Sequence, residues 1–309
     1  MALPNPSSTP RLSVIIPTRN RASSLQRLLD SLATASELAI EKIEIIAVNN
    51  GSTDETREVL NAEHTRGSRA EFLALDESRA GKSAAINRAL AVARGSVLMV
   101  LDDDVVVEEE CLLKHIEAHE RGEFAAIQGR ILPGRDRDGN SADPLRLREY
   151  NIPLIDYGEE ITAIRGLTGT NMSFNRRVLE KVGLFNTRLG PGAAGFSEDT
   201  EYSIRIRQAG FKIGYTPYAI VYHELNPVRY GRAYNRDVEY RKGLSRSLYR
   251  HDSIALKVLP DLLANCIRYG FYRLLGSRQK AYKTEGRILK RWGYLVGKLR
   301  SSNTRTRPT

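Results

Sequence analysis

Residues 95–107 read Gly-Ser-Val-Leu-Met-Val-Leu-Asp-Asp-Asp-Val-Val-Val, and this stretch decides the fold. Residues 97–101 form an unbroken apolar run of strand length. A run without polar alternation is typical of a strand covered on both faces, as in a parallel sheet. Three acids end the run, and ligands of open α/β sheets bind beyond the carboxyl ends of the strands. The sequence therefore predicts a buried strand with a ligand site at its end.

The three acids, Asp102, Asp103 and Asp104, repel one another unless a cation neutralises them. Oxygen ligands suit Mg²⁺ or Mn²⁺, which keep coordination positions open for water and substrate phosphates. A solvated acidic turn is the alternative interpretation, and the core strand before the acids disfavours it. The stretch therefore predicts a Mn²⁺ or Mg²⁺ site.

Three strand, loop and helix units precede the acidic stretch. Strands are expected at residues 12–16, 43–48 and 72–75. The helices that follow are expected around residues 25–32, up to Leu60, and over 84–93. Ser23 or Ser24 is expected to cap the first helix, and Ser52 or Thr53 the second. This alternation predicts an α/β fold with a doubly wound, mostly parallel sheet flanked by helices.

The second half of the chain is less regular. Strands are expected at residues 125–132, 212–216 and 220–224, with a loop at 133–144. Helices are expected at 176–182 and around Tyr202 to Ala209.

Composition places the chain in a reducing compartment. Its 309 residues include two cysteines, Cys111 and Cys266, far apart in sequence. The first residues lack a secretory signal, and no run of about 18 apolar residues predicts a spanning helix. We expect a cytoplasmic protein.

The basic charge is concentrated in the last 81 residues. Residues 229–309 carry 20 Lys and Arg against 5 Asp and Glu, whereas the whole chain has 47 and 37, which leaves 27 against 32 before them. Amphipathic helical spacing runs from Leu256 to Leu274 and again over 287–300, and the only tryptophan, Trp292, lies in the second stretch. A basic helical extension peripheral on the inner membrane leaflet is therefore expected. A helical cap with a solvated basic face is the main alternative. Nucleic acid is not expected, because no binding module is recognised.

Five stretches in order, at residues 13–20, 49–54, 81–87, 101–105 and 197–201, resemble the family 2 glycosyltransferases. The resemblance covers roughly residues 11–224. It implies a GT-A fold and an inverting, hexosyltransferase-like enzyme that uses nucleotide-sugar donors. We expect a flexible tail at 1–10, a catalytic domain at 11–228 and the basic extension at 229–309, as a membrane-surface or acceptor-binding region.

The resemblance implies a nucleotide site at the strand ends. Lys82 and the free N–H groups at the start of its helix would face phosphate oxygens. For Arg19, a surface loop cation is an equal alternative. The residues implied to bind nucleotide or donor are Pro17, Thr18, Arg19, Asn49, Asn50, Lys82, Asp102 and Asp103.

The same resemblance implies roles for the acids. Asp104 would be the main metal ligand, with Asp102 also assigned to the metal, or acting through water, ribose or donor sugar. His223 would add a ligand, although a structural histidine is more common at a strand end. Asp199 would be the general base that takes the acceptor hydroxyl proton, with Glu198 beside it. A helix-capping acid is the alternative for Asp199.

One position departs from the family pattern. The second strand usually ends in an aspartate that binds the base, and here the residue is Asn49. An amide both donates and accepts, so base choice is open among UDP, GDP and dTDP, with UDP favoured.

The expected reaction transfers a sugar to a hydroxyl of a glycan or lipid-linked saccharide, as in polysaccharide biosynthesis. A sugar-phosphate nucleotidyltransferase is an alternative, as is a non-catalytic nucleotide-sugar-binding scaffold at the membrane surface. Retention of both Asp104 and Asp199 disfavours the scaffold. Oligomeric state, donor sugar and acceptor identity are not predicted.

Overall fold

The computed structural model describes residues 9–39, 42–67, 69–136, 154–226, 229 and 231–305, with side chains up to residue 300. The chain divides into two compact units. Among the described residues, the first contains those up to Thr187 together with Glu198–Asn226, and the second contains Arg188–Ser197 and those after residue 227. The domain limits 11–228 and 229–309 stay a prediction, and residues 1–8 of the expected tail lie outside the described residues.

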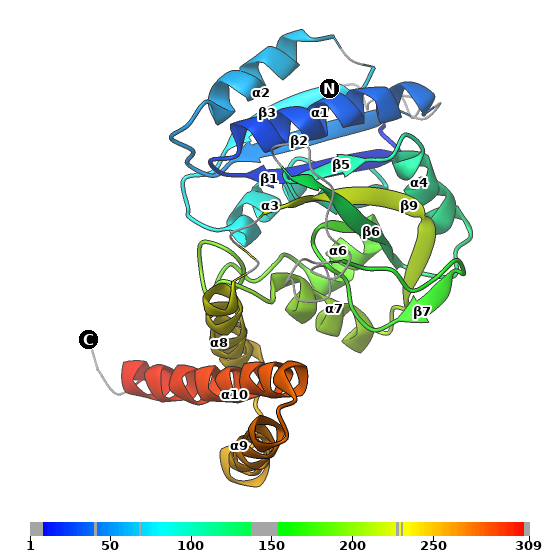
Figure 1. Cartoon of the computed structure of the whole chain (residues 1–309). Coiled ribbons are helices and arrows are strands. Elements are labelled where there is room, and N and C mark those ends of the chain that lie inside the picture. The colour runs from blue at the N-terminus through cyan, green and yellow to red at the C-terminus, as the bar shows by residue number, and fades with distance from the viewer. Residues whose placement is uncertain are drawn as a thin grey trace. The chain divides into compact units, whose positions relative to one another are not determined.

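The first unit is built on one sheet (Figure 1). In the described part of the chain it has nine strands: Leu12–Thr18 (β1), Ile43–Asn49 (β2), Glu71–Asp76 (β3), Val97–Leu101 (β4), Val105–Val107 (β5), Ala126–Asp136 (β6), Thr162–Ile164 (β7), Asn171–Asn175 (β8) and Ile213–Leu225 (β9). Their order is β3-β2-β1-β4-β8-β6-β9-β5, with β7 paired to β9. Strands β3, β2, β1, β4, β6 and β9 share one direction, whereas β5, β7 and β8 run against their neighbours. The predicted α/β class with a mostly parallel sheet is confirmed.

Helices cover both faces of this sheet. They are Ala22–Leu38 (α1), Thr56–Thr65 (α2), Lys82–Leu90 (α3), Cys111–Glu120 (α4), Arg176–Val182 (α6) and Glu198–Gln208 (α7). The first core group joins α1, α2 and α4 to one face, and the second joins α3, α6 and α7 to the other.

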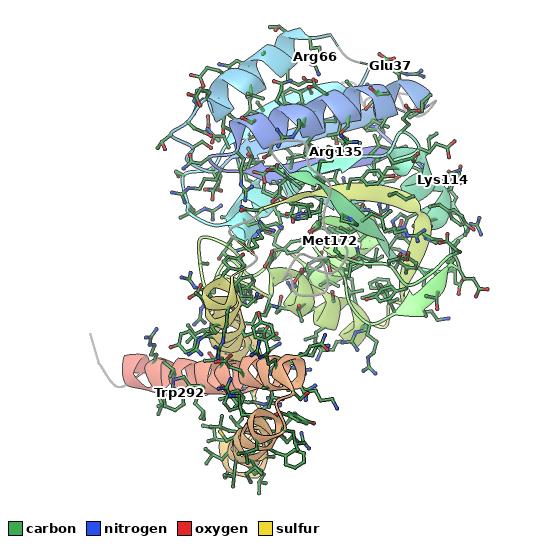
Figure 2. The ribbon with its side chains drawn as sticks, in the orientation of Figure 1. Glu37, Arg66, Lys114, Arg135, Met172 and Trp292 are labelled. Carbon is green, nitrogen blue, oxygen red and sulfur yellow. The ribbon has the colours of Figure 1, made fainter. Side chains whose placement is uncertain are left out.

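Alternate residues of the central strands serve these two core groups. In β1, Val14 and Ile16 belong to the first group and Ile15 to the second. Met172 of β8 lies in the second group (Figure 2). Every residue of β4 is buried, as the unbroken apolar run predicts. Because β4 is fixed on both faces, the acids after it begin at a defined point.

The structure corrects several local expectations. Helix α1 begins at Ala22 and α2 at Thr56, so none of the four proposed serine and threonine caps is an N-cap. Instead, Asp54 Oδ1 accepts a hydrogen bond from Thr56 N at 3.1 Å. Residues 133–136 continue β6 and are not a loop, and residues 137–144 lie outside the described range. The two strands expected at 212–216 and 220–224 form one strand, β9.

The second unit contains Arg232–Tyr249 (α8), a π-helical turn at Ile254–Val258, Leu259–Leu274 (α9) and Arg278–Arg305 (α10). Helices α8 and α10 meet at glycines. A Cβ on Gly293 would lie 2.1 Å from Tyr240 O, and one on Gly243 would lie 2.1 Å from Lys290 O. The two backbones therefore approach more closely than any side chain would allow. Within the described residues, no helix has the length and apolarity needed to cross a membrane.

Candidate active site

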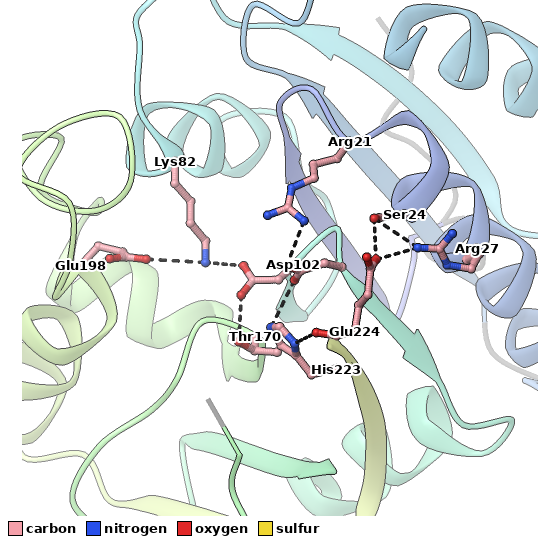
Figure 3. Close-up of polar contacts among 10 residues, drawn as sticks. Arg21, Ser24, Arg27, Lys82, Asp102, Thr170, Glu198, His223 and Glu224 are labelled. Atoms are coloured by element: carbon pink, nitrogen blue, oxygen red, sulfur yellow. Dashed lines mark hydrogen bonds and ion pairs between the residues drawn. The ribbon is translucent and has the colours of Figure 1, made fainter. Parts of the chain in front are cut away.

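Two of the three acids after β4, Asp102 and Asp104, form ion pairs with cationic side chains from other elements, which Figure 3 shows for Asp102. The ammonium of Lys82, at the start of α3, donates a hydrogen bond to Asp102 Oδ1. Thr170, just before β8, donates its hydroxyl to Asp102 Oδ2 at 2.8 Å. Each oxygen of Asp102 thus accepts a hydrogen bond from a residue of another segment.

Lys82 also faces the acid at the start of α7. Its Nζ lies 3.5 Å from Glu198 Oε1. Burial alone would lower the pKa of Lys82, but the charges of Asp102 and Glu198 outweigh it and the pKa is raised. Burial and the charge of Asp199 raise the pKa of Glu198 to about 7. The Lys82 ammonium therefore links Asp102 after β4 to Glu198 at the start of α7.

Asp104 faces Arg21 and His223. Its Oδ2 lies 3.5 Å from Arg21 Nη1, and its Oδ1 lies 3.3 Å from His223 Nε2. Asp104 and His223 are 6% and 1% exposed. His223 Nδ1 lies 2.8 Å from Glu224 O, and because a carbonyl only accepts, Nδ1 carries a proton. In the neutral ring, Nε2 then points its lone pair toward a carboxylate oxygen.

This convergence of lone pairs fits a bound cation. Asp104 and His223 provide an oxygen and a nitrogen ligand, and a ring whose other nitrogen is held by a carbonyl is typical of metal-binding histidine. Among the described residues, no three His, Cys, Asp or Glu side chains form a complete metal-binding group. Asp104 and His223 by themselves form a partial site, which suits a metal that shares its coordination with water and phosphate.

Asp103 lies between Asp102 and Asp104 in the chain. Burial and the charge of Asp104 raise its pKa to about 7, although Arg21 opposes the shift. The pKa of this carboxyl at the strand end therefore lies near neutral pH.

The end of β9 is tied to α1. Glu224 Oε2 accepts hydrogen bonds from Ser24 Oγ and Arg27 Nη2, each at 2.6 Å. Its backbone N–H donates to Asp104 O at 2.8 Å. Glu224 therefore fixes both His223, its neighbour in the chain, and the backbone of Asp104.

Asn49 and Asn50 brace the loops beside the site. Asn50 donates to Glu77 O and Arg79 O at 2.9 and 2.8 Å, and accepts from Gly81 N at 2.7 Å. These bonds fix the loop that delivers Lys82. Asn49 accepts from Ser52 N at 3.0 Å and donates to Asp76 Oδ1 at 3.1 Å.

Asp199 is half-buried in the first turn of α7. Its Oδ2 accepts a hydrogen bond from Gly169 N at 3.2 Å, and its Oδ1 accepts one from Thr200 N at 2.6 Å. A Cβ on Gly169 would lie 3.1 Å from Lys82 Nζ, so this glycine lets the lysine pass close to the backbone. Asp199 also contributes to the raised pKa of Lys82, which ties it electrostatically to the cluster.

Most of the predicted site residues come together here. Lys82, Asp102, Glu198 and His223 take part in the contacts of Figure 3. Pro17 and Thr18 are buried at the end of β1.

Arg19 is exposed, and among the described residues no ion pair holds it. Arg21, two residues later, is the arginine that faces Asp104. Sequence reasoning missed Arg21, Thr170, Gly169 and Glu224. Only Arg21 carried a usable signal, because it lies in the same loop as Arg19.

Comparison with known proteins identifies this arrangement. The model of the glycosyl transferase family 2 matches residues 13–183, more than half of the chain. The chain belongs to the glycosyl transferase family 2. The expected family, and with it an enzyme of the glycosyltransferase kind, is confirmed.

Relatives similar in sequence carry the same description. The chain is 27% identical over 229 residues to the probable glycosyltransferase YdaM of Bacillus subtilis, covering 71% of this chain and 52% of YdaM. It is 26% identical over 264 residues to the glycosyltransferase AglE of Haloferax volcanii, covering 83% of both. The chain thus spans about half the length of YdaM.

The mannosyltransferase PcManGT of Pyrobaculum calidifontis, solved with GDP-Man and Mn²⁺, superposes with a TM-score of 0.62 at 19% identity. The superposition covers 96% of this chain and 89% of PcManGT. The fold of the family 2 glycosyltransferase is GT-A, as expected.

Proposed function

We propose that this family 2 glycosyltransferase is an inverting, metal-dependent enzyme that moves a sugar from a nucleotide-sugar donor to a hydroxyl of a glycan or lipid-linked saccharide. The observation that carries the proposal is the pairing of Asp104 with His223 at 3.3 Å, beside the ammonium of Lys82. An acid and a histidine whose lone pairs converge attract a divalent ion. A neighbouring ammonium attracts phosphate.

The donor diphosphate would lie at the carboxyl ends of β1 and β4. Asp104 and His223 would hold Mn²⁺ or Mg²⁺, and the bound ion would neutralise charge that builds on the leaving nucleoside diphosphate. Lys82 would exchange part of its pairing with Asp102 and Glu198 for phosphate oxygens. Its ammonium is buried among acids and already charged, so it needs no proton before it binds the donor.

Asp199 is proposed as the general base. Inversion requires a carboxylate on the acceptor side to take the hydroxyl proton during attack. The Gly169 and Thr200 N–H groups hold both oxygens of Asp199, which fixes the orientation of its carboxylate. Glu198, whose pKa is raised to about 7, stays beside Lys82 and is proposed to position it.

The donor base is proposed to be uracil, bound near the end of β2. Asn49 and Asp76 pair across adjacent strand ends, so an amide and a carboxylate are presented together. This pair supplies the donor and acceptor groups that a base edge requires.

The second unit is proposed to associate with an anionic membrane surface. Large apolar side chains on α9 are exposed, with Leu263, Ile267, Phe271 and Leu274 at 64%, 65%, 56% and 88%. They recur three or four residues apart, so they share one helix face. The excess of Lys and Arg after residue 228 supports attraction to anionic lipid.

The Asp199→Asn variant separates this function from simple donor binding. It keeps the shape of the side chain and removes the basic oxygen, so donor binding should change by less than about threefold while transfer falls by about a hundredfold or more. Donor binding is measured by calorimetry, and transfer by release of nucleoside diphosphate with a glycan acceptor. Glu180→Gln, the same change of acid to amide at an exposed position of α6, is the control. Near-normal transfer by Asp199→Asn would remove the base role.

A further inference from the structure

The second unit contains an open pocket that the donor and acceptor chemistry does not use. Its volume is about 380 Å³. It lies between the start of α8, the end of α9 and the first two turns of α10. The lining includes Arg232, Tyr269, Arg273, Arg278, Tyr282 and Glu285.

The pocket carries positive charge that its own carboxylate does not neutralise. Glu285 accepts two hydrogen bonds at 2.9 Å from Arg232 Nη2 and is also paired with Arg236. Its single charge is therefore shared between two guanidinium groups. Within the described part of the chain, no carboxylate pairs with Arg273 or Arg278. The pocket thus offers two guanidinium groups to an incoming anion.

Helical spacing places the two arginines and the two tyrosines on helix faces that line the same pocket. Tyr269 and Arg273 are four residues apart on α9, and Arg278 and Tyr282 are four residues apart on α10. Residues at this spacing share one helix face. Each helix therefore contributes one cation and one phenol to the same pocket.

The pocket borders the exposed apolar face of α9. On the side of α9 that meets α10, Asn265 is buried and Asp261 pairs with Arg291. The exposed face with Leu263 and Ile267 lies on the other side of the helix, and Tyr269 and Arg273 stand at the flank between the two. A bilayer that covered the apolar face would bring its phosphate layer to the level of the pocket.

We propose that this pocket binds the phosphate group of an anionic lipid. Arginine forks bind phosphate oxygens in pairs, and the tyrosines add hydroxyl donors and ring surface for the glycerol part. The inference rests on the proposed membrane association, because the lipid reaches the pocket from a bilayer on α9. Its consequence is that the second unit binds a particular lipid group and not only negative charge.

A double variant tests the pocket against general electrostatics. Arg273→Gln/Arg278→Gln removes the two unpaired cations, whereas Arg250→Gln/Arg287→Gln removes two exposed cations outside the pocket. Arg287 lies nine residues after Arg278 and so on the opposite side of α10. Flotation with phosphatidylcholine vesicles that contain phosphatidic acid should fall at least about tenfold more for the pocket variant than for the control. Equal losses would overturn the pocket while leaving membrane association in place.

Soluble ligands decide the question without a bilayer. Dihexanoyl phosphatidic acid, below the concentration at which it forms micelles, and inorganic phosphate are each titrated into the full-length protein and into both variants. The lipid should bind more tightly than inorganic phosphate, and only the pocket variant should lose it. Equal binding of both ligands would make this a free-phosphate site, and no binding of either would overturn the pocket. If the wild-type protein failed to float but bound the soluble lipid through Arg273 and Arg278, the pocket would stand and the proposed membrane association would fail.

Discussion

Asp103 is a residue of the candidate site whose burial lowers the stability of the folded chain at neutral pH. The pKa of Asp103 is raised to about 7 in the folded chain, above the ordinary value of 3.8. Between these values the folded chain holds a proton that the unfolded chain has lost. Stability therefore falls as pH rises through this window and stays at the lower level above it. The proposed cation site therefore lowers the stability of the folded chain above this window when no cation is bound.

The Asp103→Asn variant should remove that dependence. With a chelator present, it should match the wild-type protein near pH 4 and exceed its free energy of unfolding by on the order of 2 kcal/mol at pH 8. Urea unfolding followed by circular dichroism at both values measures the difference. Glu109→Gln, at an exposed glutamate, is the control and should change little. A difference that stayed constant with pH would contradict the assignment.

Sequence predicted the acids better than their partners. Asp102, Asp103 and Asp104 follow a strand that its apolar run identifies, so their place at the sheet edge could be read directly. Thr170 lies 68 residues after its partner Asp102, and Glu224 lies 120 residues after its partner Asp104. No local sequence pattern marks either residue. Arg21 is different, since it shares a loop with Arg19 and only backbone geometry decides which of them faces the acids.

At the scale of elements, the crossing of α8 and α10 depends on backbone contact. Gly293→Ala would place a methyl group 2.1 Å from Tyr240 O, so the helices must separate. We expect a loss of at least about 2 kcal/mol. Gly270→Ala, in α9, meets nothing within 4 Å and should gain up to about 1 kcal/mol from helix propensity. Trp292 on α10, labelled in Figure 2, allows unfolding of this unit to be followed by its fluorescence in urea. Equal effects of the two substitutions would contradict the close crossing.

Strand and helix positions were predictable where periodicity was strong, but their ends were not. Ser24 was expected to cap α1, whereas its hydroxyl donates to Glu224, 200 residues later in the chain. The sequence pattern predicts two strands where the structure has the single strand β9, and Pro217 lies between the two predicted strands. At this point the register shifts: Gly129 and Arg130 of β6, which are consecutive, pair with Thr216 and Ile220 of β9. A proline is tolerated in such an irregularity. These features depend on tertiary partners that sequence patterns do not reveal.

At the scale of the whole molecule, the family model matches residues 13–183, and composition alone marked the basic residues after 228. The charge asymmetry identified the basic second unit, but not that Arg188–Ser197 belongs to it. In that segment, Ala194 O accepts from Ser245 Oγ at 3.0 Å, and Phe196 N donates to the same hydroxyl at 3.2 Å. The chain then continues directly into Glu198 and Asp199. The residues before the proposed base are therefore held by α8, a relationship without any sequence signal.

The central claim is that the acidic strand end binds a nucleotide through a divalent ion. The most direct measurement is calorimetric titration of UDP, GDP and dTDP into the full-length protein and the Asp104→Asn variant, each with and without Mn²⁺. We predict that UDP binds most tightly, that Mn²⁺ strengthens its binding at least about tenfold, and that Asp104→Asn abolishes this gain. Nucleotide binding that is indifferent both to Mn²⁺ and to Asp104→Asn, or no nucleotide binding at all, would contradict the account.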